Sequence, residues 1–365
     1  MKITSAKVYE YRLPLVRPLI LKSGRITERE GLLVRLTSDS GQSSWGEAAS
    51  LPGFSRESLS EARIELVGLK DELRGVSIPP GLERLDGEFT RWLGHLKLCS
   101  SVQFAIEVAV LGLLAKGRGI TPAGLLSDHA SDYVRLNGLI TDDSAIIESA
   151  RHFVSHEYIS IKLKVGNRTL DDDLARVRDL SRELPEDVTL RLDANRAWMY
   201  EEAARFAEAV RDCELEYIEE PLADSSRLKD LVEHTGLRVA LDESLLGMAP
   251  GNLSKHDYVS AIVLKPTLLG GLEKTARFMR VAREMKITAV VSSCFESAVG
   301  IAALAQFAAA YGSLEIPVGL DTLSWFEQDL LKVPIEYSRG CIHIAQSARA
   351  ADSVNESMLT EVSGG

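Results

Sequence analysis

Five charged residues each end a short apolar segment, and they recur at nearly regular intervals through the middle of the chain. They are Lys164 in YISIKLKVG, Asp193 in VTLRLDANRAW, Glu219 in LEYIEEP, Asp242 in LRVALDES and Lys265 in AIVLKP. Their separations of 29, 26, 23 and 23 residues match the length of one strand, one helix and two loops. A (β/α)8 barrel places its active site at the carboxyl ends of its strands, so such a series is typical of a barrel site.

The chain from about residue 133 alternates strand-like and helix-like segments. The strand candidates are VRLNGLI, YISIKLKV, VTLRLDA, LEYIEE, LRVALDE, AIVLKP, ITAVVSS and LEIPVG. Between them, segments such as LDDDLARVRDLSREL and YEEAARFAEAVRDC carry one apolar face at helical spacing. Eight strands with intervening helices predict an α/β protein with a closed, parallel (β/α)8-type (TIM-like) barrel rather than an open sheet.

The first hundred residues follow a different pattern, which predicts an α+β capping domain. Residues 2–13, 31–39 and 43–50 alternate apolar and polar as antiparallel strands do. Helices are expected over 56–73, with Ser55 as its N-cap, and over about 82–95. We therefore expect a cap over 1–100, a barrel over 101–325, and a segment over 326–365 that returns to the cap and ends in a disordered polar tail.

Composition excludes several classes of partner. The net charge of −11 argues against nucleic acid, which requires a basic face. The apolar stretch at about 301–311 is too short to span a bilayer, and the N-terminus has no secretory apolar region. Four scattered cysteines without metal-ligand spacing are typical of a reduced, cytoplasmic protein. The sequence leaves the oligomeric state open.

The three carboxylates of the series suggest a metal site. Asp193, Glu219 and Asp242 come from consecutive predicted strands, so their side chains can converge, and carboxylates this close repel one another unless a cation lies among them. Three such oxygens with water and substrate oxygens satisfy Mg²⁺, or Mn²⁺ in its place. The alternative for each acid alone is a helix cap or a partner for arginine.

The two outer lysines suggest proton transfer. Lys164 and Lys265 would reach a closed barrel's cavity from opposite sides of the metal, which suits removal of a proton from a carbon next to a carboxylate. Lys162 shares a strand face with Lys164, and a second ammonium there favours the neutral, basic form of Lys164. Mg²⁺ with a lysine base is the pattern of enolase-superfamily sites.

Weaker signals lie at the last strands and in the cap. Ser292 and Ser293 end one strand and can hold an anion or simply cap the next helix, and Gly319 ends the eighth strand. The segment 19–31 and the turn that holds Phe54 could fold over the barrel mouth as lids. The pair His152 and His156 has helical metal spacing without a visible third ligand, so we expect surface residues.

The sequence resembles the enolase superfamily over nearly its whole length, in its muconate-lactonizing-enzyme-like branch. The motifs that carry this resemblance are KLK at 162–164, LDAN, EEP, LDES and LKP at 265. Within the branch it is similar to the o-succinylbenzoate synthase family, in WGEAASLPGFSRES, RLDANRAW, LKPTLLGGLEK, SSCFESAVG and GLDTLSWF.

This resemblance implies a reaction and a set of roles. The reaction is dehydration of 2-succinyl-6-hydroxy-2,4-cyclohexadiene-1-carboxylate, a small-molecule carboxylate, to o-succinylbenzoate in menaquinone synthesis. Lys164 would act as base and then acid, and Lys265 as a cation beside the intermediate. The remaining implied roles are Mg²⁺ binding by Asp193, Glu219 and Asp242, contact with the succinyl carboxylate by Ser292 and Ser293, and support by Arg191 and Asn195.

Two alternatives stay open. The chain lacks the late histidine base of mandelate-racemase-like relatives, and Gly319-Leu320-Asp321 replaces the Asp-x-Asp of dipeptide epimerases. N-acylamino acid racemases use the same two lysines on opposite faces of the substrate, so the residues do not exclude that activity. A non-catalytic metal-binding module on the same scaffold is the third possibility.

Overall fold

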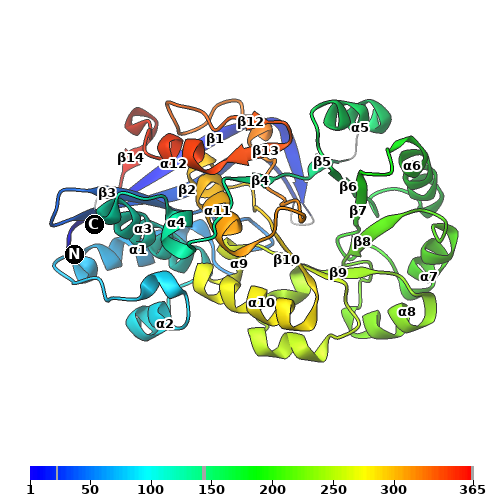
Figure 1. Ribbon diagram of the computed structural model, residues 1–365, viewed down its shortest axis with the longest axis horizontal. Coiled ribbons are helices and arrows are strands. Elements are labelled where there is room, and N and C mark those ends of the chain that lie inside the picture. The colour runs from blue at the N-terminus through cyan, green and yellow to red at the C-terminus, as the bar shows by residue number, and fades with distance from the viewer. Residues whose placement is uncertain (22–23, 142–144, 363–365) are drawn as a thin grey trace.

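The fold contains two main sheets, an antiparallel sheet at one end of the molecule and a curled parallel sheet at the other (Figure 1). The computed structural model describes residues 1–21, 24–141 and 145–362. The antiparallel sheet has the strand order β14-β1-β2-β3, formed by β1 (Ile3–Leu21), β2 (Gly24–Ser38), β3 (Ser43–Ala48) and β14 (Thr360–Glu361). This sheet joins both ends of the chain in one layer.

The β1–β2 hairpin is longer than the sequence pattern predicts. Most of the expected loop over 19–31 consists of strand residues, because Leu19 pairs with Ile26 and Leu21 with Gly24. Two residues of that loop, 22 and 23, lie outside the described part of the chain. The loop expected to act as a lid is therefore largely an arm of the cap sheet.

Helix α1 (Leu59–Leu73) corrects one predicted cap. Its N-cap is Ser58, not Ser55, because Glu61 stands three residues later and completes a capping box. The Ser58 amide donates to the Glu61 carboxylate at 2.7 Å, and the Ser58 hydroxyl accepts from the Glu61 amide at 3.2 Å. Ser55 instead accepts a hydrogen bond from the amide of Leu51.

The helix expected over 82–95 is divided into three pieces. Two 3-10 turns (Leu82–Arg84 and Gly94–Leu96) flank α2 (Glu88–Leu93). Gly87 precedes α2 with a φ of 97°, a conformation that ends any continuous helix there. The capping carboxylate for α2 comes from Glu273 of the barrel, which accepts from the amides of Gly87 and Phe89.

Seven parallel strands in the order β11-β10-β9-β8-β7-β6-β5 form the curled sheet of the barrel. They are β5 (Gly138–Ile140), β6 (Ser160–Lys164), β7 (Thr189–Asp193), β8 (Leu215–Glu219), β9 (Val239–Leu241), β10 (Ala261–Leu264) and β11 (Thr288–Val291). The predicted eighth strand contributes only single bridges, Val318 to Leu136 and Gly319 to Ser292. Pro317 has no amide hydrogen to donate and so limits strand pairing there.

The helices α5 (Ile146–Ser155), α6 (Leu170–Glu183), α7 (Tyr200–Ala209) and α8 (Leu228–Thr235) cover one side of the barrel (Figure 1). The rest of the barrel is covered by α9 (Pro266–Leu269), α10 (Leu272–Met285) and α11 (Ala298–Tyr311). Two further helices are α3 (Ser100–Arg118) and the short α4 (Pro122–Leu126). The α/β barrel fold with an α+β cap is confirmed.

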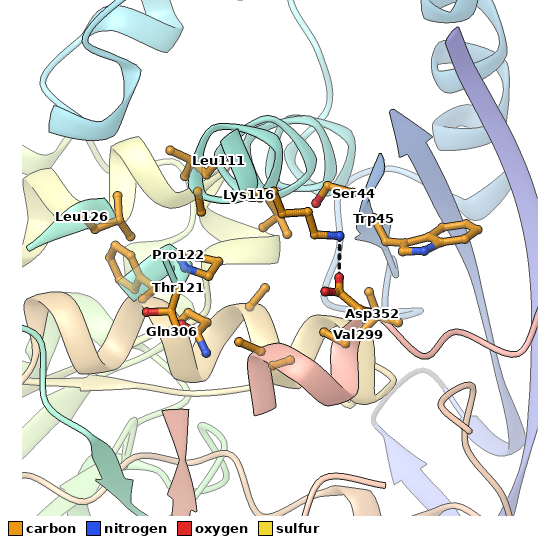
Figure 2. Close-up of a pocket in the computed structure, with 18 of the residues that line it drawn as sticks. Ser44, Trp45, Leu111, Lys116, Thr121, Pro122, Leu126, Val299, Gln306 and Asp352 are labelled. Atoms are coloured by element: carbon orange, nitrogen blue, oxygen red, sulfur yellow. Dashed lines mark ion pairs between the residues drawn. The ribbon is translucent and has the colours of Figure 1, made fainter. Parts of the chain in front are cut away.

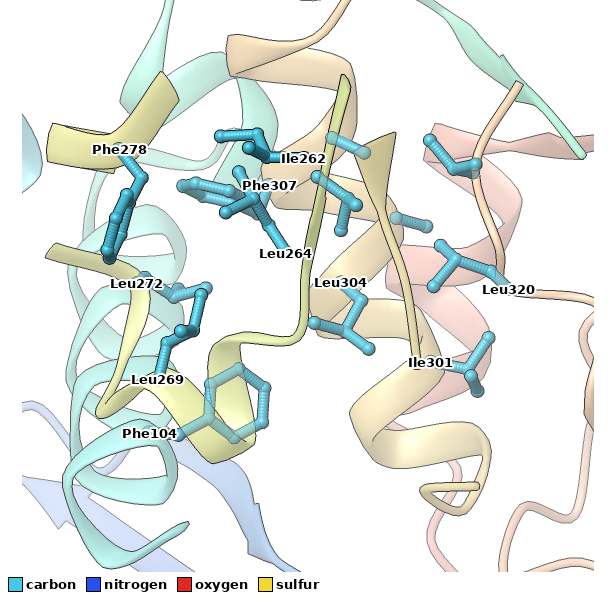
Figure 3. Packing of buried hydrophobic residues seen from close by; sticks show 14 of the residues in the cluster. Phe104, Ile262, Leu264, Leu269, Leu272, Phe278, Ile301, Leu304, Phe307 and Leu320 are labelled. Carbon is cyan, nitrogen blue, oxygen red and sulfur yellow. The ribbon is translucent and has the colours of Figure 1, made fainter. Parts of the chain in front are cut away.

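Buried side chains join α3 to the barrel (Figure 3). Phe104 of α3 packs in one cluster with Leu272 and Phe278 of α10 and with Phe307 of α11, and all four are at most 3% exposed. Helix α3 is long and apolar enough to cross a membrane by composition, but 67% of its apolar window is buried in the fold. A core helix meets the same criterion, so this is weak evidence for a membrane span.

The first strand candidate and the C-terminal segment differ from expectation. Residues 134–140 divide between β4 (Tyr133–Arg135) and β5, and β4 pairs with β13 (Cys341–His343), which also pairs with β12 (Tyr337–Ser338). The tail contains α12 (Ile344–Ala351) and β14, which pairs with Tyr9 and Glu10 of β1. The expectation of a disordered tail is wrong up to residue 362, because strand pairing holds it to the cap sheet.

Candidate active site

A cavity of about 70 Å³ lies at the carboxyl ends of the barrel strands and contains most of the predicted site residues. Its polar lining residues are Asn137, Lys162, Lys164, Asp193, Asn195, Lys265, Ser292, Ser293, Asp321 and Thr322, together with Gly319. Leu19, Leu21, Leu51 and Phe54 of the cap line its apolar side. The 19–31 segment and the Phe54 turn therefore both reach the site, as their place in the sequence suggested.

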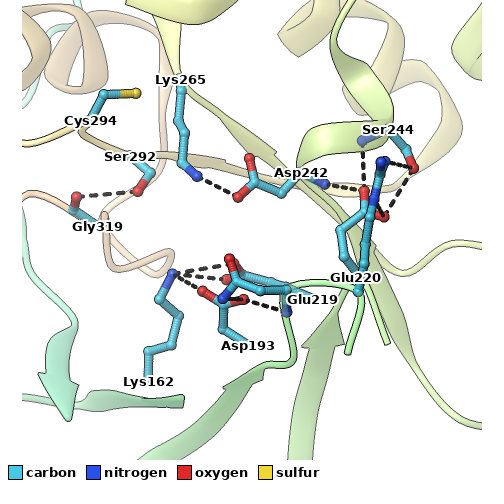
Figure 4. A network of polar contacts seen from close by, with 12 residues as sticks. Lys162, Asp193, Glu219, Glu220, Asp242, Ser244, Lys265, Ser292, Cys294 and Gly319 are labelled. Carbon is cyan, nitrogen blue, oxygen red and sulfur yellow. Dashed lines mark hydrogen bonds and ion pairs between the residues drawn. The ribbon is translucent and has the colours of Figure 1, made fainter. Parts of the chain in front are cut away.

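Strand register places the lysines and carboxylates side by side. Lys164 stands opposite Asp193 on the neighbouring strand, and Asp193 stands opposite Glu219 on the next. Nζ of Lys162 lies 3.4 Å from Oδ2 of Asp193 and 3.2 Å from Oε2 of Glu219, and Figure 4 shows its contacts to both carboxylates. Nζ of Lys164 lies 3.6 Å from Oδ2 of Asp193.

Lys265 enters the cavity from the end of β10, across from Lys162 (Figure 4). Its ammonium donates a short hydrogen bond to Oδ2 of Asp242. It also lies 5.6 Å from the centre of the Phe54 ring, close enough for a cation–π interaction. Lys265 is thus held as a cation between a barrel carboxylate and a cap aromatic ring.

The pKa values follow from burial and from these contacts. Burial alone lowers the pKa of Lys265, but the Asp242 carboxylate outweighs it and holds that pKa well above its ordinary value. Burial raises the pKa of Asp193, yet Lys164 and Lys162 reverse this and hold it below its usual range. Burial raises the pKa of Glu219, and Asp193 and Asp242 add to the effect despite Lys162. Asp193 and Lys265 thus remain charged near neutral pH.

The donor set at the strand ends fits a hard divalent cation in chemistry. Asp193, Glu219 and Asp242 supply the carboxylate oxygens that such a cation prefers. The ammonium groups of Lys162 and Lys265 contact Glu219 and Asp242, so positive charge is already present beside these carboxylates. Over residues 1–21, 24–141 and 145–362, however, no three acidic, His or Cys side chains are arranged to hold a metal. The metal role of the three carboxylates stays a prediction.

Glu220 binds the backbone of Asp242, one of the three strand-end carboxylates. It is 1% exposed, and its Oε1 accepts from the amides of Asp242 at 2.9 Å and Ser244 at 2.7 Å. Its Oε2 accepts from Nε of Arg196 at 3.1 Å, and Figure 4 shows the resulting network. The second acid of the EEP motif therefore fixes the backbone that carries Asp242.

Ser292, Ser293 and Gly319 lie together at the last two strands. The Ser292 hydroxyl donates to the Gly319 carbonyl at 3.3 Å, and the Ser293 hydroxyl lies 3.1 Å from that of Thr322. A Cβ atom on Gly319 would lie 2.5 Å from Oγ of Ser292. Only glycine therefore leaves Ser292 in this position.

Arg191 and Asn195 differ in their relation to the cavity. Asn195 lines it, and its Nδ2 donates to Oδ1 of Asp193 at 2.8 Å. Arg191 is fully buried beneath the cavity, where it pairs with Glu216 at 2.8 Å and donates to Oδ1 of Asn137 at 3.2 Å. Its contacts are with protein groups, so it supports the floor of the site.

Several residues of the cavity were given no role in the sequence analysis. Asn137 lines it without a motif that marks it, whereas Phe295 and Asp321 lie within the motifs SSCFESAVG and GLDTLSWF. Asp321 accepts a hydrogen bond from the Tyr158 hydroxyl at 3.0 Å, and burial raises its pKa to about 6 despite that bond. Asn137 could have been identified as a candidate because it is a polar residue within the apolar segment VRLNGLI. The exposed residues His152, on α5, and His156, directly after it, do not line the cavity, as expected.

A larger cavity of about 280 Å³ lies between α3, α4, α11 and α12 (Figure 2). Its lining is mostly apolar, with an ion pair between Lys116 and Asp352 at one side. It contains none of the lysines or carboxylates at the strand ends. Convergent titratable groups are a better criterion for an active site than volume, so the smaller cavity is the candidate site.

Two known families match this chain. The family described as "Enolase C-terminal domain-like" matches residues 145–348, and "MenC, N-terminal domain" matches residues 3–75. An o-succinylbenzoate synthase of Citrobacter koseri is 35% identical over 88% of this chain and 91% of its own. That of Enterobacter sp. (strain 638) is 32% identical over 90% and 93%.

Solved structures share the fold. Muconate lactonizing enzyme from Pseudomonas fluorescens superimposes with a TM-score of 0.84 at 21% identity, covering 98% of each chain. The L-Ala-D/L-Glu epimerase from Bacillus subtilis gives a TM-score of 0.81 at 25% identity, over 94% of this chain and 96% of its own. The barrel with its cap is thus the architecture of both structures.

Proposed function

The chain belongs to the o-succinylbenzoate synthases of the enolase superfamily, and we propose that the cavity at its strand ends is where the reaction takes place. Synthases of this family are dehydratases, that is, carbon–oxygen lyases of menaquinone synthesis. The substrate is 2-succinyl-6-hydroxy-2,4-cyclohexadiene-1-carboxylate. The observation that supports this site most is that Lys164, Lys265 and Asp193 line a single cavity.

Lys164 acts first as the base. Its amine takes the proton from the ring carbon that bears the carboxylate, and the C–H electron pair moves onto that carboxylate, which becomes an enediolate. The pair then returns to form a ring double bond as the bond from the neighbouring carbon to its hydroxyl group breaks, and the departing oxygen takes the proton back from Lys164 as water. One lysine on one face of the ring therefore completes the elimination and leaves an aromatic product.

Lys265 stabilises the negative charge that builds up between these two steps. Its raised pKa keeps it an ammonium, and its bond to Asp242 and contact with Phe54 fix its direction. Lys162 supports the site by holding Asp193 and Glu219 in place. The contacts of Lys265 with Asp242 and Phe54 favour a role for Lys265 as a fixed cation over a role as a proton donor.

Members of the enolase superfamily typically bind Mg²⁺, and Asp193, Glu219 and Asp242 would hold it here, or Mn²⁺ in its place. The bound ion supplies positive charge that lowers the cost of charge on the substrate carboxylate. Asn195 holds Asp193, and Glu220 fixes the backbone of Asp242. Together with the contact of Lys162 to Glu219, the chain's own contacts thus orient all three carboxylates.

The succinyl side of the substrate would meet Ser292, Ser293 and the Gly319 backbone. Residues 1–100, with the segment 326–365, would close over a barrel of 101–325, and Leu19, Leu51 and Phe54 would exclude water from the ring. We expect the enzyme to work in the cytoplasm on a small carboxylate, without nucleic acid or membrane. Its oligomeric state is left open.

Turnover of the cyclohexadiene carboxylate tests this function. Loss of diene absorbance should require Mg²⁺, stop when EDTA is added and return with excess Mg²⁺. A kcat/KM above ~10⁴ M⁻¹s⁻¹ is expected, as for an enzyme with its own substrate. Turnover far below that value, with folded protein and saturating Mg²⁺, would contradict the proposal.

Racemisation of N-acylamino acids is a second candidate activity. Lys164 and Lys265 both line the cavity, which is the arrangement that proton exchange on two faces requires. Deuterium exchange at the α-carbon of N-succinyl amino acids in D₂O measures it. Exchange at a rate comparable with dehydration would establish the activity, and its absence would leave dehydration alone.

A further inference from the structure

One fully buried arginine connects the cap to the wall of the site. Arg29 of β2 is 2% exposed, and within the described residues its side chain donates four hydrogen bonds, all to backbone carbonyls. Its Nη1 donates to Ser50 at 3.0 Å and its Nη2 to Ala49 at 3.1 Å. On the barrel side, its Nε donates to Phe295 at 3.1 Å and its Nη2 to Cys294 at 3.3 Å.

Both segments that Arg29 holds form walls of the cavity. Ser50 directly precedes Leu51, which lines the cavity, and the same turn carries Phe54. Cys294 and Phe295 also line it, from the barrel side, and follow Ser292 and Ser293 in the chain. The guanidinium therefore sets the gap between the cap wall and the serine-bearing wall, because it binds both at once.

The backbone at Phe295 needs such a partner. Its φ is 59°, in the left-handed region that aromatic residues rarely occupy without support. The Arg29 bond to the Phe295 carbonyl is one support. The Phe295 ring, edge-on to Trp325 at 5.2 Å, is another. A planar fork of five donors can serve four carbonyls in two segments, whereas a lysine has three donors on one nitrogen.

We propose that Arg29 is a positioning residue that selects for the succinyl arm of the substrate. It acts by fixing Cys294 and Phe295, and with them the two serines, at the distance from Leu51 and Phe54 that this arm fills. The inference rests on the proposed function. Because Arg29 contacts neither Lys164 nor the strand-end carboxylates, its loss should spare proton transfer and affect binding of the arm.

Inhibition by two ligands tests the proposal. Arg29→Lys keeps the charge and Arg29→Met removes it, and both should weaken o-succinylbenzoate binding and raise KM by about 10- to 100-fold, with a smaller change in kcat. Benzoate lacks the succinyl arm, so its inhibition constant should stay within about twofold. Leu66→Ala, in the cap core away from the site, is the control for lost stability, and its kinetic constants should match the wild type.

The outcomes separate this inference from the proposed function. Wild-type protein without dehydratase turnover would contradict the function itself. An active wild type with unchanged KM in Arg29→Lys and Arg29→Met, or with benzoate and o-succinylbenzoate weakened equally, would overturn only the positioning role. Thermal midpoints of all four proteins confirm that each is folded at the assay temperature.

Discussion

Nζ of Lys162 lies 3.2 Å from Oε2 of Glu219 and so joins β6 to β8 across the strand between them. The side chains are 11% and 1% exposed, so this ion pair lies inside the barrel. Removing one member of a buried pair leaves the other charge without compensation, which costs more than the pair itself contributes. We therefore expect loss of the contact between Lys162 and Glu219 to destabilise the folded protein as well as to disturb the site.

Lys162→Met should lower the free energy of unfolding of the metal-free protein by about 3–5 kcal/mol. Lys7→Ala is the control, because Lys7 pairs with Glu361 at 3.0 Å on the surface, with 41% and 48% exposure. That change should leave the free energy of unfolding nearly unchanged, because solvent screens an exposed pair. Urea denaturation measures the free energy of unfolding of both variants. Equal decreases in the two would show that the buried pair contributes no more to stability than the exposed one.

The same variant also tests the metal role of the carboxylates. If Glu219 and Asp193 bind Mg²⁺, saturating Mg²⁺ should stabilise Lys162→Met more than the wild type, since the ion replaces the lost ammonium. Unfolding in Mg²⁺ and in EDTA gives the difference for each protein. No stabilisation of either protein by Mg²⁺ would contradict the assignment of the three carboxylates.

Lys265 should act through its charge. Lys265→Met should lower kcat by about 10²-fold or more, whereas Lys265→Arg should retain part of the activity, because a guanidinium keeps the cation near Asp242. The raised pKa of Lys265 also predicts no loss of activity from its titration up to pH 9. The diene assay across pH measures both, and equal activity in the two variants would contradict a charge-based role.

Gly319→Ala should displace Ser292. The added Cβ would lie 2.5 Å from Oγ of Ser292, so the hydroxyl must move and kcat/KM should fall about 10-fold or more. Gly68→Ala is the matched control, because no atom lies within 4 Å of its added Cβ on α1. That variant should keep full activity. Equal kinetics in both would show that the position of Ser292 is unimportant.

Glu107 should make stability depend on pH. It is fully buried on α3, accepts from the amide of Glu273 at 3.0 Å, and burial raises its pKa from 4.5 to about 8. Between these values the folded protein keeps a proton that the unfolded chain has lost. This group's contribution to stability therefore falls as pH rises from 4.5 to about 8.

Glu107→Gln removes this titration and keeps an acceptor for the Glu273 amide. The thermal midpoint of the variant should exceed that of the wild type increasingly as pH rises from 5.5 to 8.5. All other titrating groups are shared, so the difference between the two proteins isolates Glu107. A difference that does not change with pH would contradict the buried, protonated carboxyl.

The barrel and its polar series were predictable because strand and helix periods repeat. A charged residue at the end of an apolar strand can be read directly from the sequence, and Lys164, Asp193 and Glu219 prove to be neighbours in register. The eighth strand was overestimated, because Leu314 to Gly319 has strand-like composition but Pro317 limits its pairing.

Contacts between distant segments were not predictable in the same way. Arg29 lies in the cap, and its partner Cys294 is 265 residues away in the chain. Glu107 lies on α3, and its partner Glu273 is 166 residues away. No local pattern distinguishes a buried arginine that binds carbonyls from an exposed one. The N-cap of α1 was missed for a simpler reason, since Ser55 and Ser58 are both acceptable caps and only Glu61 selects Ser58.

The most direct test of the account compares wild-type protein with Lys164→Ala on the cyclohexadiene carboxylate. The account predicts that the variant binds Mg²⁺ with an affinity within a few-fold of the wild type but loses about 10⁴-fold in kcat, because the base that removes the proton is gone. Full dehydratase activity in folded Lys164→Ala would contradict the central role of this lysine.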